Sequence, residues 1–447
     1  MGSTPRAETL RSAAPRVDLF ALAALAVHLA LLLRLRAVAW PEVTTPGYLW
    51  SRGMLMYRDI LREHTPGATG LLALLFGIFG EHAWVLKAFA AAGPLAAHAL
   101  LLRETRRSAW PIRAVASAFF LAVFYSCDGN AVWPTVLMSA LAIPIAAAGS
   151  RGRFATAGLL LGLAILLKQT AAYAVAIAAV WLLLQRRPRD AARLFFGSCL
   201  PYFATLAVFA ALGAGVAMLR WTILVPFTVR VPVATFQPGF WTAATLLFGF
   251  LPLAVEAALE RPGEYATSSA WLLAIGTGFA LISYPRFDML QTVASVPCLA
   301  VGAARLMNRR PRLLSFAARA AVLALTLSRA SVVAAGSRFD GKVLFWNDEP
   351  AFNALIEKLR GLPRDTPLYS ELWGNVLPRS GLLPPGRLWV HPWFVWFFPV
   401  DQAGERIRRA ASQPGTVFAG YRGKHPGETR VGPYAIWRAD FPGSGPP

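Results

Sequence analysis

Charged residues are scarce in this chain. Asp, Glu, Lys and Arg make up 15% of its 447 residues, whereas 56% are hydrophobic. A soluble domain usually contains about one-quarter charged residues, because its surface has to be solvated. One soluble core could not absorb so much leucine, alanine, valine and phenylalanine. The composition therefore excludes an ordinary soluble protein, and it predicts helices that cross a bilayer.

Cysteine is nearly absent as well. Cys127, Cys199 and Cys298 all lie in or beside apolar runs. Their number and spacing indicate neither a disulfide framework nor a zinc site. The first apolar run, Val17 to Leu33, is longer than the hydrophobic region of a signal peptide and lacks a small-x-small cleavage site. We interpret this run as a retained first span.

Acidic residues are too few to balance the basic ones, with 23 Asp and Glu against 44 Lys and Arg and a formal net charge of +21. In a soluble protein this excess would suggest a nucleic-acid partner. Here much of it lies in short segments between apolar runs, at 103–113, 151–153, 186–193 and 309–312. Such segments stay on the cytoplasmic side of a membrane. We therefore expect membrane lipids and no nucleic acid as partners, and an inner-membrane protein whose N-terminus is cytoplasmic.

The apolar runs predict about eleven transmembrane helices. Their predicted ranges are 17–33, 83–102, 114–126, 131–148, 154–167, 170–184, 194–213, 240–258, 267–283, 289–306 and 313–335. Because the number is odd, the C-terminal tail is expected outside the cytoplasm. Leu71 to Phe79 is too short to cross, so we interpret it as a juxtamembrane helix. Lys168 and Gln169 interrupt the apolar stretch 154–184. This stretch fits either one long tilted helix or two short helices that meet at the outer surface. We favour two helices, because they avoid burying the Lys168 charge in the middle of the membrane.

Two domains are predicted from these boundaries. Residues 1–336 form a transmembrane domain with an outer loop at 34–82, and residues 337–447 form a small extracytoplasmic α/β domain. Within the tail, one helical face follows the i, i+3, i+4, i+7 pattern, and short strand-like pieces come after it. The residues of that face are Phe352, Leu355, Ile356 and Leu359.

The outer loop contains acids, bases and aromatics close together. A carboxylate there could take a proton from an acceptor, and an arginine or lysine could hold a phosphate. The same composition also fits an amphipathic interface helix with ordinary ion pairs. The loop residues that we consider are Glu42, Tyr57, Arg58, Asp59 and His64.

The order of these residues resembles the C-type polytopic glycosyltransferases, which include protein mannosyltransferase-like and aminoarabinose transferase-like enzymes. An acidic residue follows the first span, and a Gly-x-x-x-Tyr-Arg-Asp stretch, a His-x-Pro stretch, a Gly-Leu-rich helix that leads to a lysine, and a late Tyr-Pro-Arg-Phe-Asp come after it. The matching positions are Glu42, Gly53, Tyr57–Asp59, His64, Pro66, 158–164 with Lys168, and 284–288. Members of the family often have an Asp-Glu pair at the first position, where this chain has Pro41-Glu42-Val43.

The resemblance implies transfer of a sugar from a polyprenyl-phosphate carrier to a glycan, lipid or protein acceptor at the outer face. It assigns catalytic roles to Glu42 or Asp59, as the base, and to Asp128 as a second carboxylate. The substrate-binding residues that it implies are Tyr57, Arg58, His64, Lys168, Tyr284 and Arg286. No cofactor is required with certainty, and a divalent metal is left open.

Purely structural interpretations of single residues stay open. Asp128 precedes Gly129 in a turn-forming pair, Lys168 could reach the membrane surface through its long side chain, and Arg286 could pair with Asp288. A lipid or solute transporter or flippase would use intramembrane charges to line a pathway instead of a reaction centre. A structural subunit of an envelope complex is a third alternative.

Overall fold

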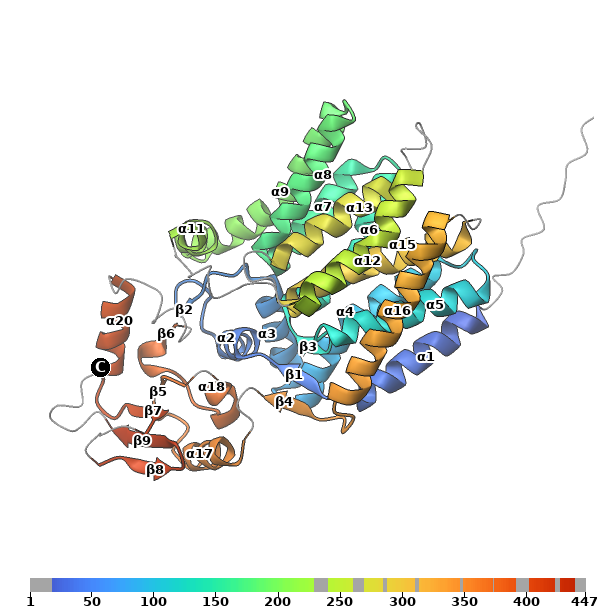
Figure 1. Cartoon of the computed structure of the whole chain (residues 1–447). Helices are drawn as coiled ribbons and strands as arrows, with labels where there is room; N and C mark the ends of the chain where they lie inside the picture. The colour runs from blue at the N-terminus through green and yellow to red at the C-terminus, as the bar shows by residue number, and fades with distance from the viewer. Residues whose placement is uncertain are drawn as a thin grey trace, which may run out of the picture.

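A computed structural model of the chain describes residues 18–228, 240–259, 269–283, 288–309, 313–345, 349–372, 374–390, 402–422 and 427–438. Long helices form one body, and the C-terminal helices and strands lie against one end of it (Figure 1). The helices of the long body are α1 Leu19–Arg34, α2 Pro41–Ser51, α3 Gly67–Phe79, α4 Ala83–Glu104, α5 Trp110–Ser126, α6 Pro134–Ser150, α7 Phe154–Leu167, α8 Ala172–Leu184, α9 Pro188–Ala211, α10 Gly215–Leu219, α11 Val225–Thr228, α12 Phe240–Leu259, α13 Ser269–Ala280, α14 Met289–Thr292, α15 Val296–Asn308 and α16 Leu313–Gly336.

Every predicted span coincides with one or more of these helices. Within the described residues, five helices are long and apolar enough to cross a membrane: α4, α9, α12, α16 and the segment Met289–Asn308. The other apolar helices have 10–17 residues. A helix of 14 residues such as α7 is about 21 Å long, which is less than the hydrocarbon thickness of roughly 30 Å. The number of crossings therefore stays a prediction.

The chain reverses at Lys168, as the two-helix interpretation requires. Lys168 is extended, with φ −157°, and a 3₁₀ turn at Gln169–Ala171 separates α7 from α8. Helices α7 and α9 are parallel: Gly158 packs on Leu194 and Gly162 packs on Ser198. Because α7 and α9 run in the same direction, α8, which connects them along the chain, must run in the opposite direction. One long tilted helix is therefore excluded.

One predicted basic loop is shorter than expected. Helix α5 begins at Trp110, so that Arg113 lies within its first turns and is 6% exposed. The Arg113 guanidinium forms an ion pair with Asp18, the N-cap residue of α1, at 2.6 Å. The starts of α1 and α5 are therefore held together at one end of the bundle.

Short parallel strands join distant segments at the other end of the bundle. Strand β1 (Ala37–Ala39) lies between β3 (Ala131–Val132) and β4 (Val343–Phe345). Strand β2 (Ile60–Leu61) pairs with β6 (Trp389–Val390). The outer loop, the turn after α5 and the start of the tail consequently share one face, and Figure 1 shows the tail on this side.

The tail contains both helices and strands. Its helices are α17 Pro350–Arg360, α18 Val376–Ser380 and α20 Gln402–Ala411. In the described part of the tail, the sheet has the order β5 (Leu368–Ser370), β7 (Val417–Tyr421), β9 (Tyr434–Arg438) and β8 (Thr429–Val431). The β5–β7 pair is parallel, and the β7–β9 and β9–β8 pairs are antiparallel. The predicted apolar face of α17 is buried, with Phe352, Leu355, Ile356 and Leu359 at 0% exposure. This face anchors α17 in the core.

Candidate functional site

Glu42 lies in the first turn of α2, directly after Pro41, and is half-buried. The positive end of the helix dipole favours the ionised form of a carboxylate at this position. Arg62, just after β2, is 2% exposed. Burial lowers the pKa of Arg62, whereas the negative charges of Glu63 and Glu42 raise it, and the guanidinium remains a cation at neutral pH. A buried arginine therefore lies within electrostatic reach of both carboxylates.

Lys168 lies at the end of α7 and is 6% exposed. Its Nζ donates to Oε1 of Gln291 in α14, and the same oxygen accepts from Nε1 of Trp133 at 3.2 Å. The Lys168 ammonium also lies 5.7 Å from the centre of the Trp133 ring, a cation–π contact. Gln169 donates to the carbonyl of Glu63 at 2.9 Å. Lys168 is thus linked to the turn after α5, to α14 and to the outer loop.

Trp133 contacts Lys168, Gln291 and residues of the outer loop. Its ring has edge contacts with Trp40 at 5.8 Å and with His64 at 6.5 Å between centroids. The His64 Nε2 is 3.3 Å from Oε1 of Glu63. We call the whole set the Trp133 cluster. It consists of Glu42, Arg62, Glu63, His64, Trp133, Lys168 and Gln291.

Arg58 and Asp59 lie at the junction of the outer loop with the tail. Arg58 is exposed and forms an ion pair with Asp59 at 2.8 Å. The Asp59 carboxylate accepts from the Leu55 amide, and its carbonyl accepts from the amide of Trp389 in β6, both at 2.8 Å. Partial burial raises the pKa of Asp59, whereas the hydrogen bonds from Arg58 and Leu55 lower it. Together the hydrogen bonds have the larger effect, so the pKa of Asp59 is below its usual value. The Asp59 carboxylate is therefore held within its own loop, and the Asp59 backbone joins this loop to the tail.

Tyr57 supports the loop from inside. It is 1% exposed, its hydroxyl donates to the carbonyl of His64 at 3.0 Å, and its ring packs edge-on against Phe209. Burial raises the pKa of Tyr57 well above its usual value, so the hydroxyl keeps its proton and remains a donor. Tyr57 has a positive φ of 69°, which non-glycine residues rarely adopt. Packing and hydrogen bonding therefore hold a tight loop that presents His64.

Asp128 lies in the turn between α5 and β3, with a positive φ of 57°. Its neighbour Gly129 has no room for a side chain, since a Cβ would lie 2.1 Å from the Phe124 ring. Surrounding protein and the nearby carboxylate of Asp288 raise the pKa of Asp128. Asp288 in turn caps α14 by accepting from the Gln291 amide at 2.9 Å. Asp128 is therefore both a turn residue and a neighbour of the Trp133 cluster.

Two predicted substrate-binding residues, Tyr284 and Arg286, lie outside the described residues. Four members of the cluster were not predicted from the sequence. Arg62 and Glu63 directly precede His64, and this adjacency was a signal that could have found them. Trp133 and Gln291 carry no such signal, because their roles arise from contacts between distant segments.

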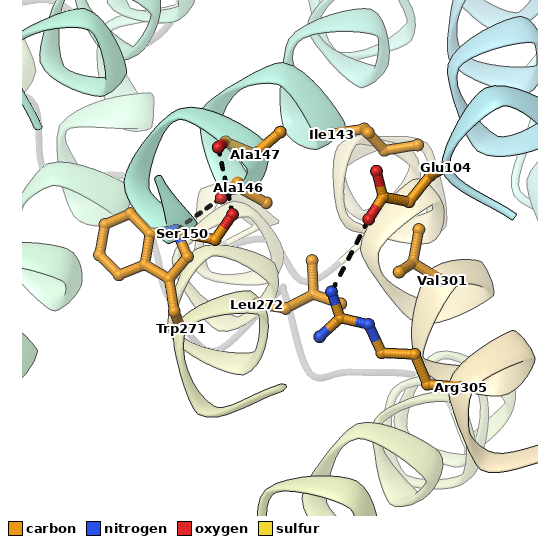
Figure 2. A pocket seen from close by; sticks show the side chains of 9 residues that line it. All are labelled: Glu104, Ile143, Ala146, Ala147, Ser150, Trp271, Leu272, Val301 and Arg305. Carbon is orange, nitrogen blue, oxygen red and sulfur yellow. Dashed lines mark hydrogen bonds and ion pairs between the residues drawn. The ribbon is translucent and has the colours of Figure 1, made fainter. Parts of the chain in front are cut away.

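A small pocket lies at the opposite end of the bundle (Figure 2). It is formed by α4, α6, α13 and α15, and Arg305 and Glu104 face one another across it at 3.9 Å. Its volume of about 20 Å³ is enough for roughly one water molecule. Helix α6 separates it from the cluster, since Trp133 precedes α6 and Ser150 ends it. The pocket is too small for a lipid-linked sugar.

A metal centre is not apparent in the described part of the chain. There, no group of three or more His, Cys, Asp or Glu side chains is arranged to hold a metal ion. The cluster instead combines two carboxylates, an imidazole and two cations. Such a set can bind a phosphate and accept a proton.

Comparison with known proteins finds similarity in structure alone. No family model and no curated protein matches the sequence. The structure is similar to the crystal structure of ArnT from Cupriavidus metallidurans bound to undecaprenyl phosphate, with a TM-score of 0.58 and 12% identity over 94% of this chain and 97% of that one. The apo structure of the same protein matches with a TM-score of 0.57 and 12% identity over 94% and 96% of the two chains. The chain is therefore a polytopic helical membrane protein with an ArnT-like fold.

Proposed function

We propose that the chain is a membrane glycosyltransferase that moves a sugar from a polyprenyl-phosphate carrier to an acceptor at the outer face of the membrane. The observation that carries the proposal is the Trp133 cluster, which gathers carboxylates and buried cations at one end of an ArnT-like bundle. Undecaprenyl phosphate is the molecule bound in one similar ArnT structure, and it supports a polyprenyl phosphate as the partner here.

Lys168 is the proposed phosphate-binding cation. In a buried site its ammonium interacts with a charged oxygen more strongly than it would in water. Negative charge accumulates on the phosphate as it leaves, so a fixed cation stabilises the transition state more than the ground state. Arg286, two residues before Asp288, is the proposed second cation. Arg58, Tyr57, His64 and Tyr284 complete the proposed binding residues.

Glu42 is the proposed general base. The acceptor hydroxyl or amine gives its proton to the Glu42 carboxylate while its lone pair forms a bond to C1 of the sugar. The bond between C1 and the phosphate oxygen breaks, and the carrier leaves as polyprenyl phosphate. A single displacement of this kind inverts C1. Asp59 is the alternative base and Asp128 the second carboxylate, but the contacts of Asp59 with Arg58 and β6 favour Glu42.

The proposed location is the inner membrane, with the N-terminus in the cytoplasm and the tail outside. The distribution of charge supports this orientation. The basic connections 103–109 and 185–187 follow the ends of α4 and α8 that lie away from the tail, whereas the cluster and the tail share the other end. A lipid-linked donor would then reach the cluster from the outer leaflet.

Transfer by the purified chain in lipid vesicles tests the proposal. Polyprenyl-phosphate-linked sugars are supplied with glycan, lipid or protein acceptors, and both the release of polyprenyl phosphate and the labelling of the acceptor are measured. We expect the two products in equal amounts. Movement of intact lipid-linked sugar across the vesicle without either product would contradict transfer and support a flippase.

A further inference from the structure

Asn375, in the tail just before α18, is fully buried where the tail meets α2. Its Nδ2 donates to the carbonyl of Ala39 at 2.9 Å, and its Oδ1 accepts from the hydroxyl of Thr44. Ala39 precedes Glu42 by three residues, and Thr44 follows it by two. One tail side chain therefore bridges the two backbone segments on either side of the proposed base. We call this arrangement the Asn375 bridge.

The orientation of the Asn375 amide follows from its partners. A carbonyl can only accept, so the NH₂ group must face Ala39 and the oxygen must face Thr44. Thr44 has a single hydroxyl proton, which must then go to Asn375. The carbonyl of Trp40, 2.8 Å from the same hydroxyl, accepts instead from the Thr44 amide at 3.0 Å. The bridge thus satisfies polar groups that would be costly to bury alone.

The start of α2 has no side-chain cap of its own. Trp40 occupies the N-cap position, and an indole only donates hydrogen bonds, so it cannot cap amides as serine or aspartate would. Pro41 at the first helical position sets the backbone direction but supplies no hydrogen bond. The tail therefore provides the hold that the local sequence lacks.

We propose that Asn375 is a positioning residue, which sets the place of the Glu42 carboxylate by holding the first turn of α2. The inference rests on the proposed function. It assigns to the tail a role in turnover, although the tail contributes no group to the Trp133 cluster within the described residues. A displacement of about 1 Å in a reacting group can lower a rate by roughly 100-fold, so a small rotation of the first turn of α2 would lower kcat.

The test compares Asn375→Ala and Thr44→Val with Thr44→Ser, which keeps the hydroxyl. We expect the first two to lower kcat by about tenfold or more while the Kd for undecaprenyl phosphate stays within about twofold. Thr44→Ser should turn over like the wild type. The double variant Asn375→Ala/Thr44→Val should be no slower than either single variant, because both remove the same bridge.

Tyr48→Phe is the matched control. Tyr48 also joins α2 to the tail, through its hydroxyl and the carbonyl of Leu382 at 3.2 Å, but it lies beyond Glu42 along the helix. We expect Tyr48→Phe to keep kcat. If it lowers kcat as much as Asn375→Ala does, or if the bridge variants lose lipid binding as much as turnover, the bridge merely attaches the tail and the inference is wrong.

A readout that needs no activity separates this inference from the proposed function. Hydrogen exchange of amides 42–45 and carbodiimide labelling of Glu42 should both increase in Thr44→Val and stay unchanged in Tyr48→Phe. Unchanged exchange and labelling in Thr44→Val would overturn the inference whatever the enzyme does. If the wild type transfers no sugar from any polyprenyl-phosphate donor, the proposed function and the role of Asn375 in turnover fail together, and increased exchange then identifies a structural bridge only.

Discussion

Two charged side chains of the Trp133 cluster lie at helix ends, where the helix dipole acts on them. Glu42 lies at the N-terminus of α2, and Lys168 lies at the C-terminus of α7. The helix dipole is positive at the first position and negative at the second, so the dipole favours the charged form of each side chain. An ionised base and a cationic phosphate ligand are the two forms that the proposed reaction needs. Because the two residues have different roles, we expect substitutions of Glu42 and of Lys168 to change different kinetic parameters.

Replacing Glu42 by Gln keeps the size of the side chain but removes its ability to accept a proton. We expect kcat to fall by roughly 100- to 10,000-fold, the usual contribution of general base catalysis, with little change in the Kd for undecaprenyl phosphate. Steady-state kinetics and lipid binding measure the two quantities. Asp59→Asn is the comparison, and a larger loss of kcat in that variant would move the role of base to Asp59.

Replacing Lys168 by Ala should affect lipid binding first. A charge-assisted hydrogen bond contributes about 1.5 to 3 kcal/mol, so the Kd for undecaprenyl phosphate should rise by roughly 10- to 150-fold. Lys168→Arg keeps the charge and should lose less. An unchanged Kd in Lys168→Ala, measured by scintillation proximity or calorimetry, would show that the ammonium does not bind the phosphate.

At the scale of elements, the parallel pair of α7 and α9 places Lys168. Gly158, Gly162 and Gly197 let the two backbones approach closely, as small residues do between membrane helices. A Cβ on Gly158 would lie 2.1 Å from the carbonyl oxygen of Leu194. The helices would have to separate to accept it, and the end of α7 would move with them.

Gly158→Ala should therefore destabilise the protein by about 1 to 3 kcal/mol, the usual range for overpacking, and it should also weaken lipid binding. Gly77→Ala in α3 is the control, because nothing lies within 4 Å of its Cβ and alanine is favoured over glycine in a helix. Thermal unfolding in detergent measures both variants. Equal melting temperatures would contradict close packing of α7 on α9.

We expect the stability of the strands that attach the tail to depend on pH through Asp340. Its carboxylate forms an ion pair with Arg36 between the segments that lead into β4 and β1, and the hydrogen bond from Arg36 lowers the pKa of Asp340 from its usual 3.8. A carboxyl with a lowered folded pKa stabilises the fold above its unfolded pKa, and this stabilisation is lost as the pH falls through the folded value.

We expect the melting temperature of Asp340→Asn to be below that of the wild type at neutral pH. The difference should shrink as the pH falls below 3.8, since protonation then removes the same charge from the wild type. Melting curves at several pH values measure this difference. A constant difference from neutral to acidic pH would mean that the Arg36 ion pair contributes nothing.

At the scale of the whole molecule, chemistry and orientation are linked. The outer loop, the turn after α5, the break after α7 and the tail all meet at one end of the bundle (Figure 1). Reporter fusions at Arg107, Arg187 and Arg310 should therefore report the cytoplasm, and a fusion at Tyr369 should report the outside. A cytoplasmic signal from Tyr369 would contradict both the predicted span number and the outer-face mechanism.

The sequence alone was sufficient to place the long apolar helices, although it did not predict α2 in the outer loop. Every predicted span coincides with helix, because an apolar run of this length expresses its preference locally and does not depend on its partners. The buried face of α17 follows its periodicity for the same reason. The resemblance of ordered motifs led to the fold that the ArnT structures share. It also named His64 and Lys168, which both contact Trp133, and Glu42, whose charge acts on buried Arg62.

Only the tertiary structure decided what these residues contact. Glu42 and Asp59 are both loop carboxylates in the sequence, yet the first lies within electrostatic reach of buried Arg62 and the second pairs with exposed Arg58. Gln291 and Asn375 have no signal in the sequence, since each acts on a side chain from a distant segment. Composition and periodicity report the environment of one segment at a time. The charge and position of a catalytic group depend on several segments at once, and packing alone brings those together.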